Sequence, residues 1–274
     1  MTAFIDGQAL AQEIQQQLVQ HVRALSRSPR LGIIIVGDNP VTESFVRTKK
    51  RFADAVGVEW IERRFPKTAT TAELVESVEE LTLISDGIVV QLPLPLHIDT
   101  TAVLRTIPTV KDVDVLSDAA FEAFRSGKHT GVPPVAGAIV RMLEAHNVPL
   151  RGTPVTIIGK GRLVGLPTKI LLERMGAEVR VIDTRTSEAL RAQFLKEGHV
   201  IISGVGIPGL VQPHMVSDDA ILIDAGTSST SGNVVGDIAP ECFEHASLVS
   251  KTPGGVGPVT VAMLFQNLIG ATLN

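Results

Sequence analysis

The sequence has almost none of the residues that cross-link a chain or build a metal centre. Cys242 is the single cysteine among 274 residues, which excludes an intramolecular disulfide. The seven histidines are scattered, and none has the paired spacing of metal ligands. Tyrosine is absent altogether. We therefore expect no metal site, and the cysteine usage fits a reducing cytoplasm.

Long apolar segments and blocks of one charge are also missing. The longest apolar stretches, "LGIIIVG" (31–37) and "AILIDAG" (220–226), have the length of strands and are too short to span a bilayer. The first residues lack the basic-then-apolar order of a signal peptide. No basic run, and no interleaving of basic and aromatic residues, suggests nucleic acid. With a net charge of −4 and 44% hydrophobic residues, we expect a soluble, cytoplasmic protein that binds neither membranes nor nucleic acids.

Short β-branched runs alternate with helical patterns from end to end. The runs that predict strands are 31–37, 58–65, 86–92, 154–159, 178–183, 199–206, 220–226 and 247–251. The helical patterns fall near 7–26, 40–56, 71–84, 135–146, 163–175, 187–196 and 258–272. Because strands buried on both faces read as continuous apolar runs, this alternation predicts an α/β fold of parallel sheets covered by helices.

A cluster of glycine and proline in "SGKHTGVPPVAG" (126–137) separates two α/β blocks. We expect one domain over 1–131 and a second over 132–251. The last helix, within 252–274, is expected to return to the first domain. A cleft between the two domains would be the natural ligand site.

The helix predicted at 40–56 directs a charged side chain toward its apolar face. Asn39 and Pro40 are typical of a helix start. At about 100° per residue, Lys49 falls in the middle of the apolar stripe, while Lys50 lies on the polar side. Lys49 would either lay its methylenes on the stripe with its ammonium in water, or face a cleft in which desolvation keeps it reactive. The apolar residues of the stripe are Val41, Phe45, Val46, Phe52, Ala53 and Val56.

The second block opens with a strand, a glycine-rich turn and a helix. The turn reads "GKGRLVG", with glycines at Gly159, Gly161 and Gly165. Such a turn lets the backbone approach a pyrophosphate, which the N-terminus of the following helix attracts. The next strand ends at Asp183, about two dozen residues after the first glycine, where an acidic residue commonly bonds a ribose hydroxyl. The turn and its context together predict dinucleotide binding.

Polar residues in the first block follow the carboxyl ends of predicted strands. Gln91 ends the strand in "DGIVVQLPLP", and the helix that carries Lys49 follows the strand at 31–37. Since ligands of parallel sheets bind at this edge, both side chains are candidates for a site. The loop "VKDVDVLS" adds Asp112 and Asp114. The alternatives are a polar strand terminus for Gln91 and solvated loop acids for the two aspartates.

The segment "TPGGVGPVT" places three glycines within four residues, just before the last helix. That much backbone freedom costs conformational entropy on folding. A close approach to a ligand or to another backbone would compensate for it.

Five segments together resemble the bifunctional methylenetetrahydrofolate dehydrogenase/cyclohydrolase family. They are "VGDNPVTESFVRTKK", "DGIVVQLPLP", "KDVD", "GKGRLVGLP" and "PGGVGPVTVAML". They occur in the family's order and cover nearly the whole chain. The resemblance implies a homodimer of two-domain subunits, each with a folate-binding catalytic domain and a Rossmann-like cofactor domain. It also implies oxidation of 5,10-methylenetetrahydrofolate to the methenyl cation, followed by hydrolysis to 10-formyltetrahydrofolate, as part of one-carbon metabolism and purine biosynthesis.

The resemblance further implies roles for individual residues. Lys49 matches the family's catalytic lysine, Gln91 the glutamine beside it, and Asp114 the aspartate that holds the pterin. The inward lysine would therefore face the folate. On the substrate side, the resemblance points to Phe45, Leu92, Pro253, Gly254, Gly255, Val256 and Gly257. On the cofactor side, it points to Gly159, Lys160, Gly161, Thr184 and Thr227, to which the end of the next strand adds Asp183 and Arg185.

The sequence departs from the family pattern at several positions. The tyrosine that usually lies one helical turn before the lysine is Phe45. The family's "GRS" turn reads "GKG", which loses a hydroxyl and replaces a guanidinium by an ammonium. The stretches "PCTP-x-G" and "KDVDG" read "VPPVAG" and "KDVDV". The binding machinery is kept, and the departures concern catalysis and the choice of cofactor.

The choice between NADP and NAD depends on opposing charges, and the family favours NADP. Lys160, Thr184 and Arg185 can hold a 2′-phosphate, whereas the carboxylate of Asp183 would repel it. We expect NADP, with NAD as the alternative, and a tetrahydrofolate derivative as substrate.

Two other functions and one assembly follow from the same residues. Another two-domain dehydrogenase, of the shikimate or amino-acid type, would share this architecture. A catalytically weakened folate-binding homologue is suggested by Phe45. A homodimer is expected through the cofactor domain, in which "TSSTSGNVVG" reads as an edge hairpin.

Overall fold

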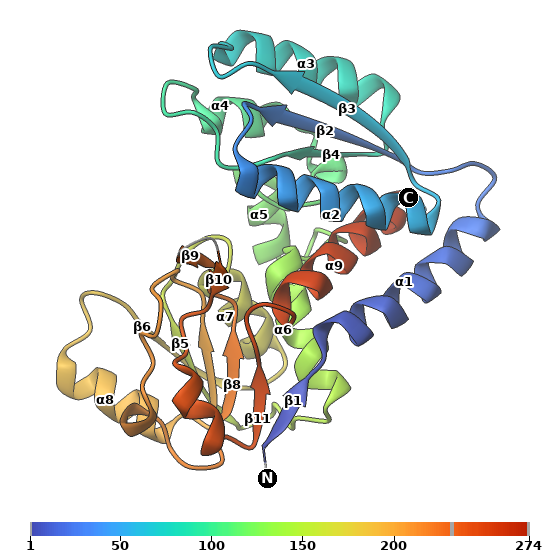
Figure 1. Ribbon diagram of the computed structural model, residues 1–274. Helices are drawn as coiled ribbons and strands as arrows, with labels where there is room; N and C mark the ends of the chain where they lie inside the picture. Colours follow the sequence, from blue (N-terminus) through green and yellow to red (C-terminus); the bar gives the residue numbers. More distant parts are fainter. Residues whose placement is uncertain (1, 231–232, 273–274) are drawn as a thin grey trace. The chain divides into compact units, whose positions relative to one another are not determined.

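The computed structural model describes residues 2–230 and 233–272 (Figure 1). The chain forms two compact units, each built from two separate stretches of sequence. Met1–Ala11 and Val135–Thr260 form unit 1, and Gln12–Pro134 and Val261–Asn274 form unit 2. Helices α1 (Gly7–Ala24) and α9 (Val256–Ala271) contribute residues to both units.

Unit 1 contains a sheet of six strands in the order β1-β11-β8-β7-β5-β6, and all neighbours run parallel. From β5 the chain proceeds to β6 on one side and then to β7 on the other. The order of strands therefore reverses between β5 and β7, and ligands of such sheets bind at the carboxyl ends of the strands at this point. The strands are β1 (Ala3–Ile5), β5 (Pro154–Ile158), β6 (Glu178–Ile182), β7 (Val200–Ser203), β8 (Ile221–Asp224) and β11 (Leu248–Ser250).

The core of unit 1 lies on both faces of this sheet. β7 and β8 are buried along their whole length, as their β-branched sequences predict. One cluster packs Ile182, Ile201, Leu222 and Val249 of the strands with residues from the following loops. The longer helices in this part of the chain are α6 (Pro134–Ala145), α7 (Gly165–Arg174) and α8 (Glu188–Glu197), and the 3-10 helices are η2 (Pro213–Met215) and η3 (Pro240–Glu244).

An antiparallel hairpin follows β8. It consists of β9 (Ser228–Thr230) and β10 (Asn233–Val235). The hairpin predicted from "TSSTSGNVVG" is thus present, and residues 231–232 at its turn lie outside the described residues.

Unit 2 contains a parallel sheet of three strands in the order β3-β2-β4. The central strand is the most apolar, and Leu31, Ile33, Ile34 and Ile35 are completely buried. The strands are β2 (Arg30–Val36), β3 (Glu59–Phe65) and β4 (Gly87–Val90). The helices are α2 (Pro40–Val56), α3 (Thr71–Ile84), α4 (Thr100–Thr106), α5 (Asp118–Arg125) and the 3-10 helix η1 (Thr109–Lys111).

Both ends of α2 are fixed by local sequence. At the start, the side chain of Asn39 accepts hydrogen bonds from the backbone N–H groups of Val41 and Thr42, at 2.9 and 3.4 Å. At the end, Gly57 adopts the left-handed conformation with φ 83°, which glycine reaches without steric penalty. The caps set the length of the helix, and with it the side of the helix on which each residue lies.

All the strands and helices predicted from apolar runs are present, with ends that differ by a few residues. The sequence did not predict β1, α4 or α5. These elements have three, seven and eight residues, which is too short for a clear apolar period. Within the described part of the chain, no helix is both long enough and apolar enough to cross a membrane.

Candidate functional site

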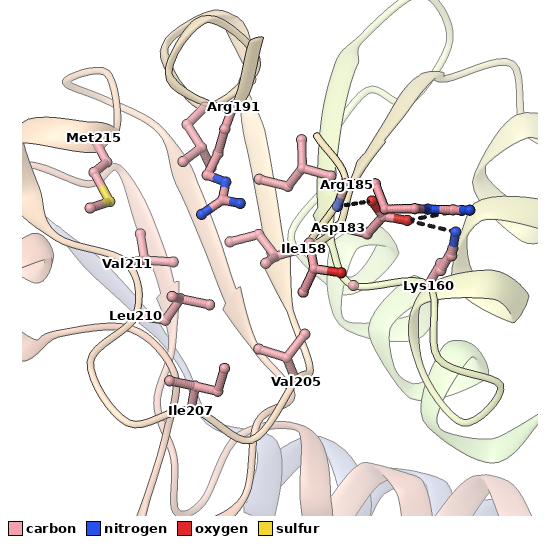
Figure 2. A pocket seen from close by; sticks show the side chains of 14 residues that line it. Ile158, Lys160, Asp183, Arg185, Arg191, Val205, Ile207, Leu210, Val211 and Met215 are labelled. Carbon is pink, nitrogen blue, oxygen red and sulfur yellow. Dashed lines mark hydrogen bonds and ion pairs between the residues drawn. The ribbon is translucent and has the colours of Figure 1, made fainter. Parts of the chain in front are cut away.

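A cavity of about 540 Å³ opens in unit 1 at the carboxyl ends of β5, β6 and β7 (Figure 2). This is the point at which the strand order reverses, and it is where a parallel sheet binds its ligand. The cavity is large enough for a nucleotide. It is lined by Ile158, Gly159, Lys160, Ile182, Asp183, Thr184, Arg185, Arg191, Leu195, Val205, Ile207, Leu210, Val211 and Met215.

The glycine-rich turn borders this cavity, and two of its three glycines are required by the local geometry. Gly159 has φ 86°, a conformation that other residues rarely adopt. A Cβ at Gly165 would lie 2.0 Å from the carbonyl oxygen of Gly159, so only glycine lets α7 start this close to β5. At Gly161 the space is open and φ is not positive, and nothing in the structure explains a glycine there. The start of α7 has no side-chain cap, and the N–H of Leu166 in its first turn donates to the carbonyl oxygen of Gly161 at 3.0 Å.

Asp183 is held in its ionised form at the edge of the cavity. Its carboxylate forms an ion pair with Nζ of Lys160 at 2.6 Å and accepts a hydrogen bond from the backbone N–H of Arg185 at 2.9 Å (Figure 2). These contacts, led by that with Lys160, lower the pKa of Asp183 to about 2. The arrangement suits a dinucleotide. A carboxylate here can accept a hydrogen bond from a ribose hydroxyl, and the side chains of Lys160 and Arg185, which both pair with Asp183, can turn to a phosphate.

The structure adds residues that the sequence did not indicate. Val205, Ile207, Leu210 and Met215 form an apolar side of the cavity, and Arg191 of α8 directs its guanidinium into it (Figure 2). No described residue forms an ion pair with Arg191. The position of the segment after β7, which follows a strand at the switch point, could have indicated that this segment borders the cavity. The sequence gives no such signal for Arg191, because an arginine in a helical pattern is normally predicted to lie on the surface.

Two of the residues expected to contact the cofactor do not line this cavity. Gly161 lies in the turn but outside the lining, and Thr227 is exposed in the segment after β8. Thr227 lies close to Gly206, since a Cβ on that glycine would be 3.8 Å from the carbonyl oxygen of Thr227.

The glycine loop before α9 is packed against other backbone. A Cβ at Gly255 would lie 2.5 Å from the carbonyl oxygen of Lys251, and one at Gly7 would lie 1.9 Å from the carbonyl oxygen of Gly255. The entropy cost of these glycines was expected to be offset by close approach to a ligand or to another backbone, and at Gly255 the close approach is to backbone. Gly254 has φ 99°, and Gly257 has open space around it. Pro253 and Gly257 are exposed, and Val256 is buried in unit 1.

In unit 2, the helix lysine meets the strand-end glutamine. The Nζ atom of Lys49 donates to Oε1 of Gln91 at 2.7 Å. Gln91 is buried, and its Nε2 donates to the carbonyl oxygen of Leu92 at 2.8 Å, so the amide is turned with its oxygen toward the lysine. Leu92 itself packs on the core of unit 2. The sequence placed both polar side chains at the carboxyl edge of the sheet, and the structure brings them into contact.

The apolar stripe of α2 is only partly buried. Val46, Phe52, Ala53 and Val56 face the core, whereas Val41 and Phe45 of the same stripe are exposed. Their exposed fractions are 53% and 45%. Periodicity gives the side of a helix but not how far along the helix the core extends. The result is an exposed aromatic ring one helical turn from Lys49.

The two aspartates of the "KDVD" loop have different roles. Asp112 is buried, and its carboxylate accepts from the backbone N–H groups of Leu116 and Ser117 at 3.2 and 2.7 Å, so it organises the start of α5. Asp114 is half-buried and close enough to Lys49 for each to affect the charge of the other. Asn267 of α9 fixes the loop between them, since its Nδ2 donates to the carbonyl oxygen of Val113 at 2.8 Å.

Burial shifts both titrating groups toward neutrality. It lowers the pKa of Lys49, and the negative charge of Asp114 opposes this. It raises the pKa of Asp114 to about 6, a shift that Lys49 reduces and Asp112 increases. A lowered pKa increases the neutral fraction of this amine, and a neutral amine held by an amide oxygen beside a carboxyl group can accept a proton from water.

Taken together, the fold and the cavity indicate an α/β dinucleotide-binding enzyme, whose other unit contains the contact between Lys49 and Gln91. Family models agree in both halves of the chain. The model described as "Tetrahydrofolate dehydrogenase/cyclohydrolase, catalytic domain" matches residues 5–114, and that described as the "NAD(P)-binding domain" matches residues 133–274. The chain belongs to the tetrahydrofolate dehydrogenase/cyclohydrolase family.

Individual relatives match over the full length. The Bifunctional protein FolD of Exiguobacterium sibiricum is 33% identical over 277 residues, which cover 99% of each chain. The solved structure of the bifunctional enzyme FolD from Campylobacter jejuni has a TM-score of 0.95 at 30% identity and covers 100% of this chain and 99% of that one. The dehydrogenase-cyclohydrolase of Trypanosoma brucei, solved with NADP and an inhibitor, has a TM-score of 0.93 at 32% identity, covering 100% and 99%.

Proposed function

We propose that the protein oxidises 5,10-methylenetetrahydrofolate to 5,10-methenyltetrahydrofolate with a nicotinamide cofactor, and hydrolyses the product to 10-formyltetrahydrofolate. The observation that carries the proposal is the 2.7 Å contact between Lys49 and Gln91, next to Asp114, in a chain of this family. Family membership argues against a shikimate- or amino-acid-type dehydrogenase. A weakened folate-binding homologue remains the second candidate, because Phe45 stands where the family usually has tyrosine.

The residues around the cavity of unit 1 fit a dinucleotide. The close packing of Gly165 on Gly159 leaves the backbone free of side chains where a pyrophosphate would approach. Lys160, Asp183, Thr184 and Arg185 would hold the ribose and any 2′-phosphate. When bound, the nicotinamide accepts a hydride. We favour NADP, with NAD as the alternative, and the NADP-bound trypanosomal relative supports this choice.

In unit 2, the residues would manage the proton of hydrolysis. The methenyl cation adds one water and releases one proton to give the neutral formyl product. Lys49 in its neutral form would accept that proton, and its lowered pKa increases the neutral fraction at a given pH. Gln91 would hold the amine in place, and Asp114 would bind the pterin. We assign Phe45 and Leu92, with Pro253, Gly254, Gly255, Val256 and Gly257, to the substrate.

One assay separates the candidates. Purified protein is mixed with 5,10-methylenetetrahydrofolate and either NADP or NAD, and the absorbance of the methenyl product is followed. Production and subsequent decay of that absorbance supports the bifunctional enzyme. Binding of folate without either change would favour the weakened homologue, and no binding of folate would contradict both.

We further propose an assembly and a location. A homodimer would form through the cofactor domain at 132–251. The folate domain is proposed over 1–131 with the returning C-terminal helix, although Met1–Ala11 group with unit 1. Light scattering at micromolar concentration tests this, and a monomer would contradict it. A cytoplasmic location is supported by the cysteine usage, since Cys242 is the single cysteine and is buried.

A further inference from the structure

One side of the dinucleotide cavity is formed by the segment that follows β7. Val205, Ile207, Leu210 and Val211 of this segment line the cavity (Figure 2). The side chains of Val205 and Ile207 are 37% and 52% exposed, so burial in the core does not hold these two residues in place. Their positions depend on how the backbone is held.

The backbone of this segment is hydrogen-bonded to one buried carboxylate. Oδ2 of Asp237 accepts from the N–H groups of Val205 and Gly206 at 2.8 and 3.3 Å, and Oδ1 accepts from the N–H of Ile207 at 2.8 Å. The hydroxyl of Ser203, at the end of β7, also donates to Oδ2 at 2.8 Å. Three N–H groups so close in sequence can face one carboxylate because Gly206 takes φ 73°.

Asp237 is itself held by a second buried carboxylate. Asp224, at the end of β8, accepts from the N–H groups of Asp237 and Ile238 at 3.1 and 3.0 Å. Two glycines make room for the pair. A Cβ at Gly226 would lie 2.2 Å from Asp237, and one at Gly236 would lie 1.9 Å from Oδ2 of Asp224. A chain of contacts thus runs from the sheet through Asp224 and Asp237 to the side of the cavity.

We propose that Asp237 is a positioning residue for dinucleotide binding, acting through the backbone of Val205, Gly206 and Ile207. Both carboxylates are almost completely buried, which is costly unless every oxygen is hydrogen-bonded. Here the carboxylate of Asp237 accepts from Ser203 and from three consecutive backbone N–H groups, and two of those three groups belong to residues that line the cavity, Val205 and Ile207. The position of Val205 also matters for the glycine-rich turn, because a Cβ at Gly159 would lie 2.4 Å from Cγ1 of Val205.

The test is Asp237→Asn, which keeps the shape but turns an N–H₂ group toward backbone donors. The inference rests on the proposed function for its ligand, so NADP⁺ binding is measured directly by calorimetry, apart from turnover. We expect the Kd for NADP⁺ to rise about tenfold or more, since hydrogen bonds to a charged acceptor are lost. Methenyl hydrolysis, assayed without dinucleotide, should change less than about twofold, because Lys49, Gln91 and Asp114, which would carry out that step, lie in unit 2.

Asp218→Asn is the matched control. Asp218 is a carboxylate of the same unit with 86% side-chain exposure, and its removal should leave both measurements unchanged. An unchanged Kd in folded Asp237→Asn protein would overturn the proposal. So would a parallel loss of NADP⁺ binding and methenyl hydrolysis, which indicates general structural damage.

A milder variant covers the case in which Asp237→Asn does not fold. Ser203→Ala removes one donor to the same carboxylate, and we expect a rise of about threefold in the Kd for NADP⁺ together with faster amide exchange at Val205 and Ile207. No change in either quantity would refute the role of Asp237. If the unaltered protein binds NADP⁺ but turns over no folate, the proposed function fails while this comparison of binding still stands.

Discussion

The amine of Lys49 lies 2.7 Å from the side-chain oxygen of Gln91, and the amide of Gln91 is oriented by its own bond to Leu92. The flexible side chain of Lys49 is thereby held at its amine by Gln91, which follows the end of β4. Because Gln91 carries no charge, this contact places the amine without stabilising its protonated form as a carboxylate partner would. The amine keeps a lowered pKa and a defined position, which are the two properties that a general base requires.

Replacing Lys49 by methionine should abolish methenyl hydrolysis and leave the fold intact. Loss of a general base typically reduces the rate by about 10²–10⁴-fold, and methionine fills the same apolar path without a buried charge. Lys50→Met is the control, because Lys50 is the next residue on the same helix and pairs with Asp54 at the surface. Rates are measured after subtraction of the uncatalysed hydrolysis. Near-normal hydrolysis by Lys49→Met would show that the lysine only packs its methylenes on the helix.

Phe45→Tyr should raise turnover modestly or leave it unchanged. The ring already offers its exposed face one turn before Lys49, and the change adds a hydroxyl at the position of the family's tyrosine. One added hydrogen bond contributes roughly 0.5–1.5 kcal/mol, which is about a tenfold effect at most. The kinetic parameters kcat and KM, measured for both reactions, test this. A gain of several hundredfold would mean that the hydroxyl has a catalytic role that Phe45 cannot supply.

Asp183→Ser should shift the cofactor preference toward NADP. In the structure, Asp183 is ionised, with a pKa of about 2, and it engages both Lys160 and Arg185. Serine removes the charge that repels a 2′-phosphate and frees the two cations to bind it. The ratio of kcat/KM for NADP to that for NAD should rise by about tenfold or more. A ratio that stays constant or falls would show that these three residues do not contact the 2′ position.

Asp114→Asn should stabilise the protein above pH 6 and have little effect below pH 4. The pKa of Asp114 is raised to about 6 in the folded state, so the folded state binds the proton more tightly than the unfolded chain. The unaltered protein therefore loses stability as pH rises through about 6. The shift corresponds to about 3 kcal/mol at most, and part of it is offset because Lys49 loses its partner. Urea unfolding at pH 4, 6 and 8 measures the difference, and a gain that is largest at pH 4 would contradict the prediction.

Val115→Gly should destabilise the protein less than Val113→Gly. Val115 has φ 56°, a left-handed conformation that costs an L-residue roughly 1–2 kcal/mol, and the family pattern has glycine here. Both valines are buried, at 1% and 2% exposure, and Val113 has no positive φ. The two variants lose similar apolar contacts, but only glycine at 115 relieves strain. Equal free energies of unfolding for the two variants would show that the loop carries no such strain.

The sequence predicted the regular elements well, because continuous apolar strands and capped helices are local signals. Lys49, Gln91 and Asp183 could be located by their places at strand ends and on a helix face. The contacts of Asp237 could not be predicted, because its backbone N–H partners lie 30 to 32 residues earlier in the chain. The exposure of Phe45 and the position of Arg191 depend on where the core ends, which periodicity does not encode.

The division of unit 2 between two distant stretches has a consequence for synthesis. Gln12–Pro134 leaves the ribosome long before Val261–Asn274 has been made. Until then, Phe52 lacks the ring of Phe265 that stacks on it at 5.0 Å. At roughly 5–20 residues per second, the nascent chain carries this incomplete core for on the order of ten seconds. A stop codon shortly before residue 261 would therefore impair the lysine site encoded more than 200 residues upstream, and a nascent chain stalled at that point would expose apolar surface to chaperones.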